Sequence, residues 1–147
     1  MSEMSVIRKW FEIASDHLRV AVNTFENMQP KQIDISCYQT QQTVEKTLKG
    51  FLLYNNIEAP ETHNLVMLCQ LCVEEYVAFS ELMDSCAELT PYGLITQYPN
   101  DIIISEEKAK IALIKAKEIY EFGISLIPEL STLKQETLEL LDGKMDS

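Results

Sequence analysis

The sequence predicts an all-α fold, an antiparallel bundle of four to five helices. Its 147 residues suffice for one domain with a hydrophobic core and are too few for two domains that each have a core of adequate size. A hydrophobic content of 46% with only four Gly and five Pro indicates a folded chain rather than a disordered one. Apolar residues recur at intervals of three and four along nearly the whole chain, which is the period of an amphipathic helix. The one β-like run, residues 102–104, is too short to form a sheet without partners.

The first predicted helix begins near Ser5, which we expect to be its N-cap, and ends before Pro30. A second helix is predicted over residues 34–54, followed by a polar turn. Thr62 or Asn64 can cap a third helix, which we expect to run on to Cys86 with a break near residues 74–75.

An irregular stretch is expected over residues 90–101. Ser105 followed by two glutamates is typical of the start of a helix, which we expect to reach about residue 127. Pro128 interrupts the pattern, so residues 1–127 are predicted to form a single helical domain. The remaining residues, 128–147, are expected to form either a C-terminal helix or a flexible tail.

The charge of the chain is strongly acidic, with a net charge of -11 and a pI near 4.5. Between Lys49 and Lys108 there is no Lys or Arg but ten Asp and Glu. This balance argues against binding to DNA or to an anionic membrane over most of the surface. We expect a cytoplasmic protein with four reduced cysteines, because the sequence shows neither a secretory signal nor an apolar run of membrane-spanning length.

The second predicted helix carries an unusual polar motif on its apolar side. On a helical wheel Gln41 falls inside the apolar arc and Glu45 on its edge, with Tyr38, Gln42 and Lys49 beside them. Buried amides and carboxylates need hydrogen-bond partners, and Glu45 with Lys49 has the spacing of a helical ion pair. Two interpretations follow. In one, Gln41 and Glu45 tie down neighbouring helix ends or loops while the lysines are solvated; in the other, the polar face is a groove or dimer seam for a ligand or partner.

The order of these motifs resembles the prokaryotic HEPN domain family over roughly residues 5–127. The resemblance rests on three parts of the sequence: Tyr38-x-x-Gln41-Gln42-x-x-Glu45-Lys46-x-Leu48-Lys49, then Thr62-His63-Asn64-Leu65, then Tyr98-Pro99 before a long Ala-rich helix. It implies a bundle of about five helices that usually dimerises. It also implies frequent pairing with a minimal nucleotidyltransferase, and proposed roles in nucleotide binding or as an RNase in toxin–antitoxin and defence systems.

The residues that would carry RNase activity in this family do not match. Ribonuclease members have an Arg followed four to six residues later by a His, whereas this chain has only Arg8, Arg19, His17 and His63, at other spacings. Many members also have Arg immediately before Tyr-Pro, where this chain has Gln97, and an amide cannot replace a bidentate anion donor.

Other chemistry has little support in the sequence. Cys69 and Cys72 form a CxxC spacing, but inside an apolar helix we expect both to act as small hydrophobes. A zinc site would need a second such pair. No phosphate-binding glycine loop is present, and no cofactor is expected.

We therefore expect a non-catalytic interaction or ligand-binding module, a homodimer whose partner is a minimal nucleotidyltransferase or whose ligand is a nucleotide. The alternatives are a divergent HEPN ribonuclease or toxin acting on RNA, and a purely structural assembly subunit, for which Gln41→Leu would be tolerated. The candidate binding residues are Tyr38, Gln41, Gln42, Glu45, Lys49, His63, Gln97, Tyr98, Lys108 and Lys115.

Overall fold

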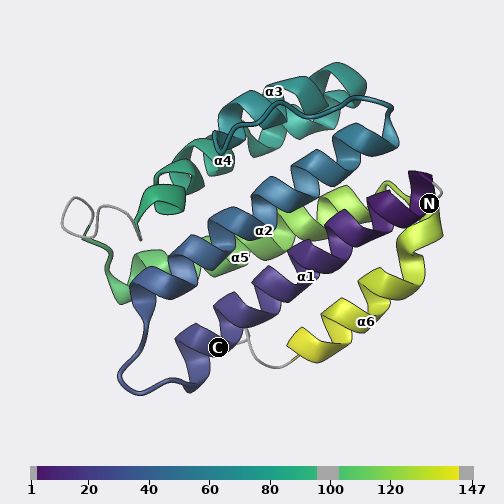
Figure 1. Ribbon diagram of the computed structural model, residues 1–147. Coiled ribbons are helices and arrows are strands. Elements are labelled where there is room, and N and C mark those ends of the chain that lie inside the picture. Colours follow the sequence, from purple (N-terminus) through teal and green to yellow (C-terminus); the bar gives the residue numbers. More distant parts are fainter. Residues whose placement is uncertain (1–2, 96–102, 143–147) are drawn as a thin grey trace.

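The computed structural model describes residues 3–95 and 103–142, and within these ranges all regular secondary structure is helical and no strand is present (Figure 1). Helices that are neighbours in the chain, such as α1 and α2, α2 and α3, and α5 and α6, pack side by side as a bundle. The elements in chain order are α1 (Glu3–Asn27), α2 (Ile33–Tyr54), α3 (Leu65–Glu75), the 3-10 helix η1 (Val77–Leu82), α4 (Met83–Leu89), the 3-10 helix η2 (Thr90–Leu94), α5 (Glu106–Ser125), the 3-10 helix η3 (Pro128–Leu130) and α6 (Ser131–Leu141).

Helix α2 lies at the centre of the bundle, in contact with α1, α3, α5 and η2. More than half of its residues are buried, including polar ones. Two glycines allow neighbouring helices to approach closely. A Cβ on Gly50 would lie 2.7 Å from Cε2 of Phe11 on α1, and a Cβ on Gly123 of α5 would lie 2.6 Å from Cγ2 of Thr47. The position of α2 explains why its polar residues had to find partners inside the protein.

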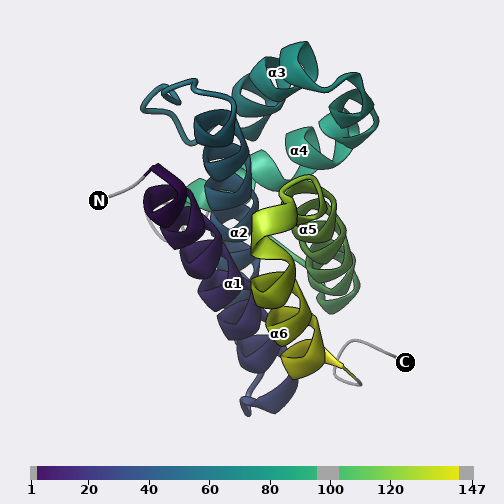
Figure 2. The ribbon, with the colours of Figure 1, turned by 90° about the vertical axis from the view of Figure 1, so that its right-hand side faces the viewer.

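The short elements α3, η1 and α4 form a separate layer beside α2 and α5 (Figures 1 and 2). Aromatic rings connect this layer to the rest of the core. The ring centroid of Phe79 on η1 lies 4.6 Å from that of Phe51 on α2 and 4.9 Å from that of Phe122 on α5. Contacts of this geometry add to the stabilisation from apolar burial.

Helix α6 packs across α1 and α5 (Figure 2) through Leu133, Thr137 and Leu141, which are buried. The Thr137 hydroxyl lies 2.8 Å from the Ser15 hydroxyl on α1 and 3.0 Å from the Tyr120 hydroxyl on α5. This group of three hydroxyls satisfies polar groups that would otherwise be buried without partners.

Several predicted helix boundaries are confirmed. Asn64 caps α3, since its side chain accepts hydrogen bonds from the backbone of Val66 and Met67, and Ser105 caps α5 by accepting from Lys108. The third predicted helix is interrupted at Tyr76, next to the break predicted near residues 74–75. The predicted N-cap at Ser5 is wrong, because α1 already includes Glu3. Among the described residues, no helix is long and apolar enough to cross a bilayer.

Candidate functional site

The carboxylate of Glu45, on the inner side of α2, is the centre of a polar cluster. Its side chain has no exposed surface, and four side-chain nitrogens surround its two oxygens. Oε1 accepts from Nδ1 of His63 at 2.8 Å and from Nε2 of Gln41 at 3.2 Å. Oε2 accepts from Nζ of Lys49 at 3.1 Å and from Nζ of Lys46 at 3.3 Å. We call these five residues the Glu45 cluster.

The charge of Glu45 is held by these donors. Burial alone would raise the pKa of the carboxyl, but hydrogen bonds from His63, Lys49 and Gln41, together with the charge of Lys46, outweigh it and lower the pKa to about 2. Glu45 is therefore an ionised hydrogen-bond acceptor near neutral pH. The ion pair predicted between Glu45 and Lys49 is confirmed.

Gln41 connects the cluster to the loop that precedes α3. Its Nε2 also donates to the carbonyl oxygen of His63 at 2.9 Å, and its Oε1 accepts from Nε2 of Gln42 at 2.7 Å. A Cβ on Gly93 of η2 would lie 2.9 Å from Cδ of Gln41, so η2 packs directly against this amide. The Gln41 amide is thus held by its hydrogen bonds to His63 and Gln42 and by its packing against Gly93.

The cluster ties the loop of residues 55–64 to α2, which is what the first interpretation of the motif expected. The lysines differ from that interpretation, because they are bound to Glu45 rather than free in solvent. The Lys49 side chain is only 12% exposed and that of Lys46 is 21% exposed. Nζ of Lys46 also lies 5.7 Å from the ring centroid of Trp10, within the range of a cation–π contact. His63, whose side chain is 72% exposed, forms the outer edge of the cluster.

A surface groove adjoins the cluster at Lys49. It has a volume of about 470 Å³ and lies between α1, α2 and the 55–64 loop. Apolar groups make up most of its wall, and two exposed glutamates, Glu58 and Glu61, lie at its rim. The lining residues are Trp10, Lys49, Leu53, Ile57, Glu58, Ala59, Pro60 and Glu61.

The remaining candidate residues lie apart from the cluster. Tyr38 is half-buried one turn before Gln42 and has no hydrogen bond or ion pair to the cluster. Lys108 is exposed at the start of α5, and Lys115 forms an ion pair with Glu88 on α4. Gln97 and Tyr98 fall outside the described residues. The candidate residues predicted from the sequence omitted Lys46 and Trp10. Lys46 directly follows Glu45 and could have been included, whereas Trp10 lies on α1 and no pattern within α2 indicates its contact with Lys46.

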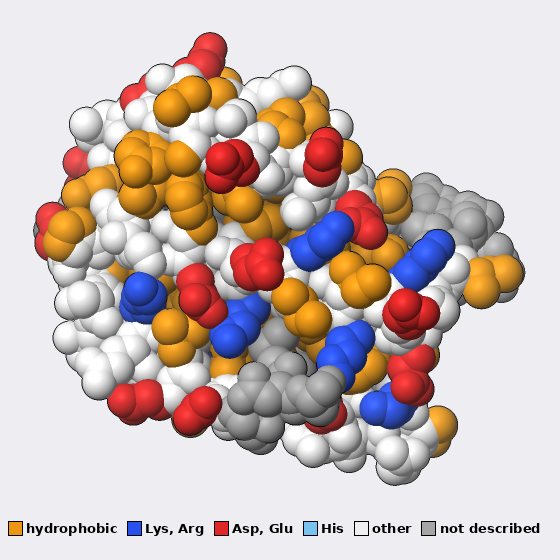
Figure 3. Space-filling view, turned by 180° about the vertical axis from the view of Figure 1, so that it is seen from behind, with side chains coloured by type: hydrophobic (Ala, Val, Ile, Leu, Met, Phe, Trp, Pro, Cys, Tyr) orange, Lys and Arg blue, Asp and Glu red, His pale blue; other side chains and the backbone are white. Residues whose placement is uncertain are grey.

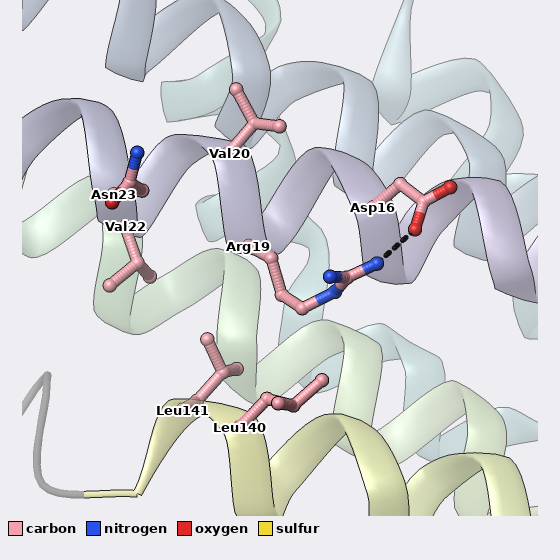
Figure 4. Close-up of a pocket in the computed structure, with 7 residues that line it drawn as sticks. All are labelled: Asp16, Arg19, Val20, Val22, Asn23, Leu140 and Leu141. Carbon is pink, nitrogen blue, oxygen red and sulfur yellow. Dashed lines mark hydrogen bonds and ion pairs between the residues drawn. The ribbon is translucent and has the colours of Figure 1, made fainter.

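A second cavity, of about 440 Å³, lies between α1 and α6 (Figure 4). Its charged groups, Arg19 and Asp16, form an ion pair with each other, and the rest of the wall is mainly aliphatic. No residue of the Glu45 cluster lines it. This cavity therefore offers no free charged group to orient a ligand.

The described residues contain no group of three or more His, Cys, Asp and Glu side chains arranged to hold a metal ion. All four cysteines are free and buried. Cys69 and Cys72 both face the core from α3, as expected for small apolar side chains.

Residues 7–127 match the HEPN domain family. The chain belongs to the HEPN family. The structure is also similar to the crystal structure of TT1696 from Thermus thermophilus, with a TM-score of 0.71 and 25% sequence identity. That similarity covers 81% of this chain and 96% of TT1696. None of the curated proteins matches the sequence.

Both arginines and both histidines of this HEPN protein have partners within the bundle. Arg8 pairs with Glu12 at 3.3 Å, and Arg19 pairs with Asp16. Nδ1 of His17 donates to Oε1 of Gln39 at 2.6 Å, and His63 donates to Glu45. No Arg and His lie together in the pattern of the ribonuclease members.

Proposed function

We propose that this HEPN-domain protein is a binding module without catalysis of its own, and that it engages a protein partner through the groove beside Lys49. One observation carries the proposal: the carboxylate of Glu45, the buried acidic group of the cluster, is fully taken up by hydrogen bonds and ion pairs from His63, Gln41, Lys46 and Lys49. A carboxyl group with a pKa of about 2 is a poor general base near pH 7, and Glu45 is also closed off from solvent.

The groove supports a protein partner better than a phosphate-bearing ligand. Its wall is largely apolar, and the carboxylates of Glu58 and Glu61 would repel an anion at its rim. A partner segment with apolar side chains and one or two basic ones would complement this surface. The minimal nucleotidyltransferase that accompanies many HEPN proteins is the first partner to test, and that step rests on the family resemblance.

A nucleotide ligand is the second candidate, favoured by the cations at the outer edge of the cluster. Lys46 and Lys49 together carry one positive charge more than Glu45, and each ammonium group has three donors. A phosphate group could bind there beside His63. A ribonuclease function has no such support, and degradation of tRNA or mRNA by the purified protein, lost on mutation of His63 or Lys49, would be needed to establish it.

The experiment that tests the proposal measures binding to the nucleotidyltransferase by calorimetry, and binding to nucleotides and dinucleotides by thermal shift. The decisive variant is Glu58→Lys/Glu61→Lys, which reverses the charge of the groove rim and leaves the Glu45 cluster intact. We expect it to weaken partner binding and to leave any nucleotide response unchanged. A nucleotide at 100 times its dissociation constant would stabilise the protein by about 2.7 kcal/mol, which is readily detected. If the charge reversal has no effect on the partner, the groove is not the binding surface.

We also propose that the protein is a homodimer that associates through the outer face of α5. Ile111 and Ile114 on that helix are exposed, as are Tyr76, directly after α3, and Val77, the first residue of η1. The ring of Tyr76 lies 6.0 Å from that of Phe122, so these exposed groups adjoin α5. On this side of the molecule apolar side chains lie among acidic and basic ones (Figure 3), a mixture typical of an interface that is not permanently buried.

A further inference from the structure

The imidazole ring of His63 is held by one of its two nitrogens, while the rest of the side chain is open to solvent. Nδ1 lies 2.8 Å from Oε1 of Glu45, whose own side chain is completely buried. Because this carboxylate is ionised and can only accept, Nδ1 carries the hydrogen of the neutral ring. The lone pair is then on Nε2, which has no hydrogen bond or ion pair within the described part of the chain. Since the His63 side chain is 72% exposed, this lone pair is accessible to small molecules.

We propose that His63 is a phosphorylation site, whose Nε2 accepts a phosphoryl group from a small phosphoramidate donor. The lone pair of Nε2 attacks the phosphorus atom, and a bond between Nε2 and phosphorus forms. The P–N bond of the donor breaks, and because the donor nitrogen is already protonated it leaves as ammonia. Nδ1 keeps its hydrogen, so the ring itself becomes positively charged. This reaction modifies the protein once and is not a catalytic turnover, so it goes beyond the binding function proposed above and does not depend on it.

Glu45 acts through His63 and is a positioning residue for this reaction. Its carboxylate fixes the tautomer of the ring and stabilises the positive charge that develops on the ring as Nε2 attacks. The other histidine lacks this arrangement. Nδ1 of His17 is bonded at 2.6 Å to Oε1 of Gln39, and the His17 side chain is half-buried. A neutral amide can orient a ring, but it carries no net charge that would stabilise a cation, so we expect the two histidines to differ in reactivity.

The charges near His63 favour a donor of low negative charge. Lys46 and Lys49 both bind Oε2 of the Glu45 carboxylate, so two ammonium groups and one carboxylate leave one positive charge in the cluster when the ring is neutral. This charge attracts an anionic phosphoryl group. Glu61, which is exposed and precedes His63 by two residues, opposes the approach of a multiply charged anion. Phosphoramidate carries a single negative charge near neutral pH, and it is therefore the donor that we use as the probe.

The test incubates the folded protein with potassium phosphoramidate at neutral pH and locates the modification by mass spectrometry. The expected product has gained the mass of one HPO3 group, and it is kept out of acid because acid hydrolyses phosphohistidine. Trypsin separates the two histidines of the chain: His17 lies in the peptide 10–19 and His63 in the peptide 50–108. Nuclear magnetic resonance of the 15N-labelled protein identifies the ring nitrogen that carries the phosphorus. A synthetic peptide of residues 60–66, which contains the same histidine without Glu45, gives the reference rate.

We expect the wild-type protein to be modified at Nε2 of His63, about tenfold faster than the reference peptide. His17 should react no faster than that peptide. Glu45→Gln should lower the rate at His63 about tenfold and direct part of the phosphorus to Nδ1, which a merely structural role of Glu45 would not do. The proposal is overturned if His63 reacts no faster than the peptide, if His17 reacts as fast as His63, or if the phosphorus of the wild-type product is on Nδ1. These three outcomes need only the wild-type protein, so they decide the question even if Glu45→Gln does not fold.

Discussion

At the scale of single residues, Glu45 shows how the protein keeps a charge inside its core. A buried carboxylate is costly, and removing its partners would leave that cost uncompensated. The structure surrounds it with two lysines, a histidine and an amide, each from a known position on α2 or on the loop before α3. The cluster is therefore a connection between two parts of the chain, and its strength should depend on pH.

Glu45→Gln should make the stability of the protein less dependent on pH in the acid range. The folded pKa of about 2 lies below the ordinary value of 4.5, so the unfolded chain takes up a proton first as the pH falls. The stabilisation by Glu45 is complete above pH 4.5 and is lost between that pH and 2, by roughly 3 kcal/mol in total. Urea unfolding of wild type and Glu45→Gln at a series of pH values would measure it. The other carboxyl groups are the same in both proteins. If the two curves of unfolding free energy against pH were parallel, the lowered pKa would not belong to Glu45.

The sequence predicted that Gln41 and Glu45 need partners, but it could not identify them. The helical wheel places both residues relative to α2 alone, whereas His63 reaches Glu45 through a loop that folds back over the helix. The solvation of Lys46 and Lys49 in one interpretation was wrong for the same reason, since the loop and Trp10 restrict the space around them. A local sequence pattern indicates which buried polar groups need a hydrogen-bond partner. Only the tertiary structure shows which residue is that partner.

Gln41→Leu should destabilise the protein by about 1–3 kcal/mol, because the carbonyl group of His63 and the amide of Gln42 would each lose a partner. The measurement is chemical unfolding in the absence of any ligand. Gln70→Leu, at an exposed position on α3, is the matched control and should change the stability very little. The contacts of Gln41 thus argue against the expectation that a structural role would tolerate leucine here. If the free energy of unfolding is unchanged, the hydrogen bonds of Gln41 make no net contribution to stability.

At the scale of elements, the sequence predicted which segments form helices and which residues cap them. It did not predict which helices contact one another. Asn64 and Ser105 follow from local chemistry, because a side-chain oxygen before a helix can accept from its first free N–H groups. The 3-10 conformation of η1 and η2, and the split that gives six α-helices within the described ranges, depend on how the short segments pack over α2 and α5. No local pattern in residues 77–94 specifies that packing.

The close contact of α2 with α5 leads to a prediction about Gly123. Gly123→Ala should destabilise the protein by about 1–3 kcal/mol, because the new methyl group would lie 2.6 Å from Cγ2 of Thr47 and α5 would have to move. Alanine would otherwise favour the helix over glycine by about 1 kcal/mol. Thermal or chemical unfolding would measure the loss.

Thr47→Ser provides the matching rescue. Serine removes the methyl group and keeps the hydroxyl that donates to the Thr43 carbonyl at 2.8 Å. The double variant Thr47→Ser/Gly123→Ala should therefore recover most of the stability lost by Gly123→Ala. Additive losses in the double variant would show that the clash lies elsewhere.

At the scale of the whole molecule, the charges are separated along the chain. The layer built from α3, η1 and α4 has no basic residue, whereas α5 carries Lys108, Lys110, Lys115 and Lys117. The basic residues lie mainly on α1, α2 and α5, and these three helices pack together, so their side chains could form a local basic patch. Yet Lys46 and Lys49 are committed to Glu45, and Lys115 and Lys117 to Glu88 and Glu121. This pairing favours contacts with proteins over contacts with a polyanion.

The last prediction concerns self-association through α5. Ile111→Glu should shift the protein from dimer to monomer, because a carboxylate in the middle of the interface would be desolvated against the apolar side chains of the partner. Ile111 points outward from α5, so the substitution should leave the melting temperature of the isolated subunit nearly unchanged. Light scattering coupled to size-exclusion chromatography measures the mass directly. Ile35→Glu, at an equally exposed position on α2, is the control and should remain dimeric. A wild-type protein that is monomeric at all concentrations, or a dimer indifferent to Ile111→Glu, would exclude this face of α5 as the contact.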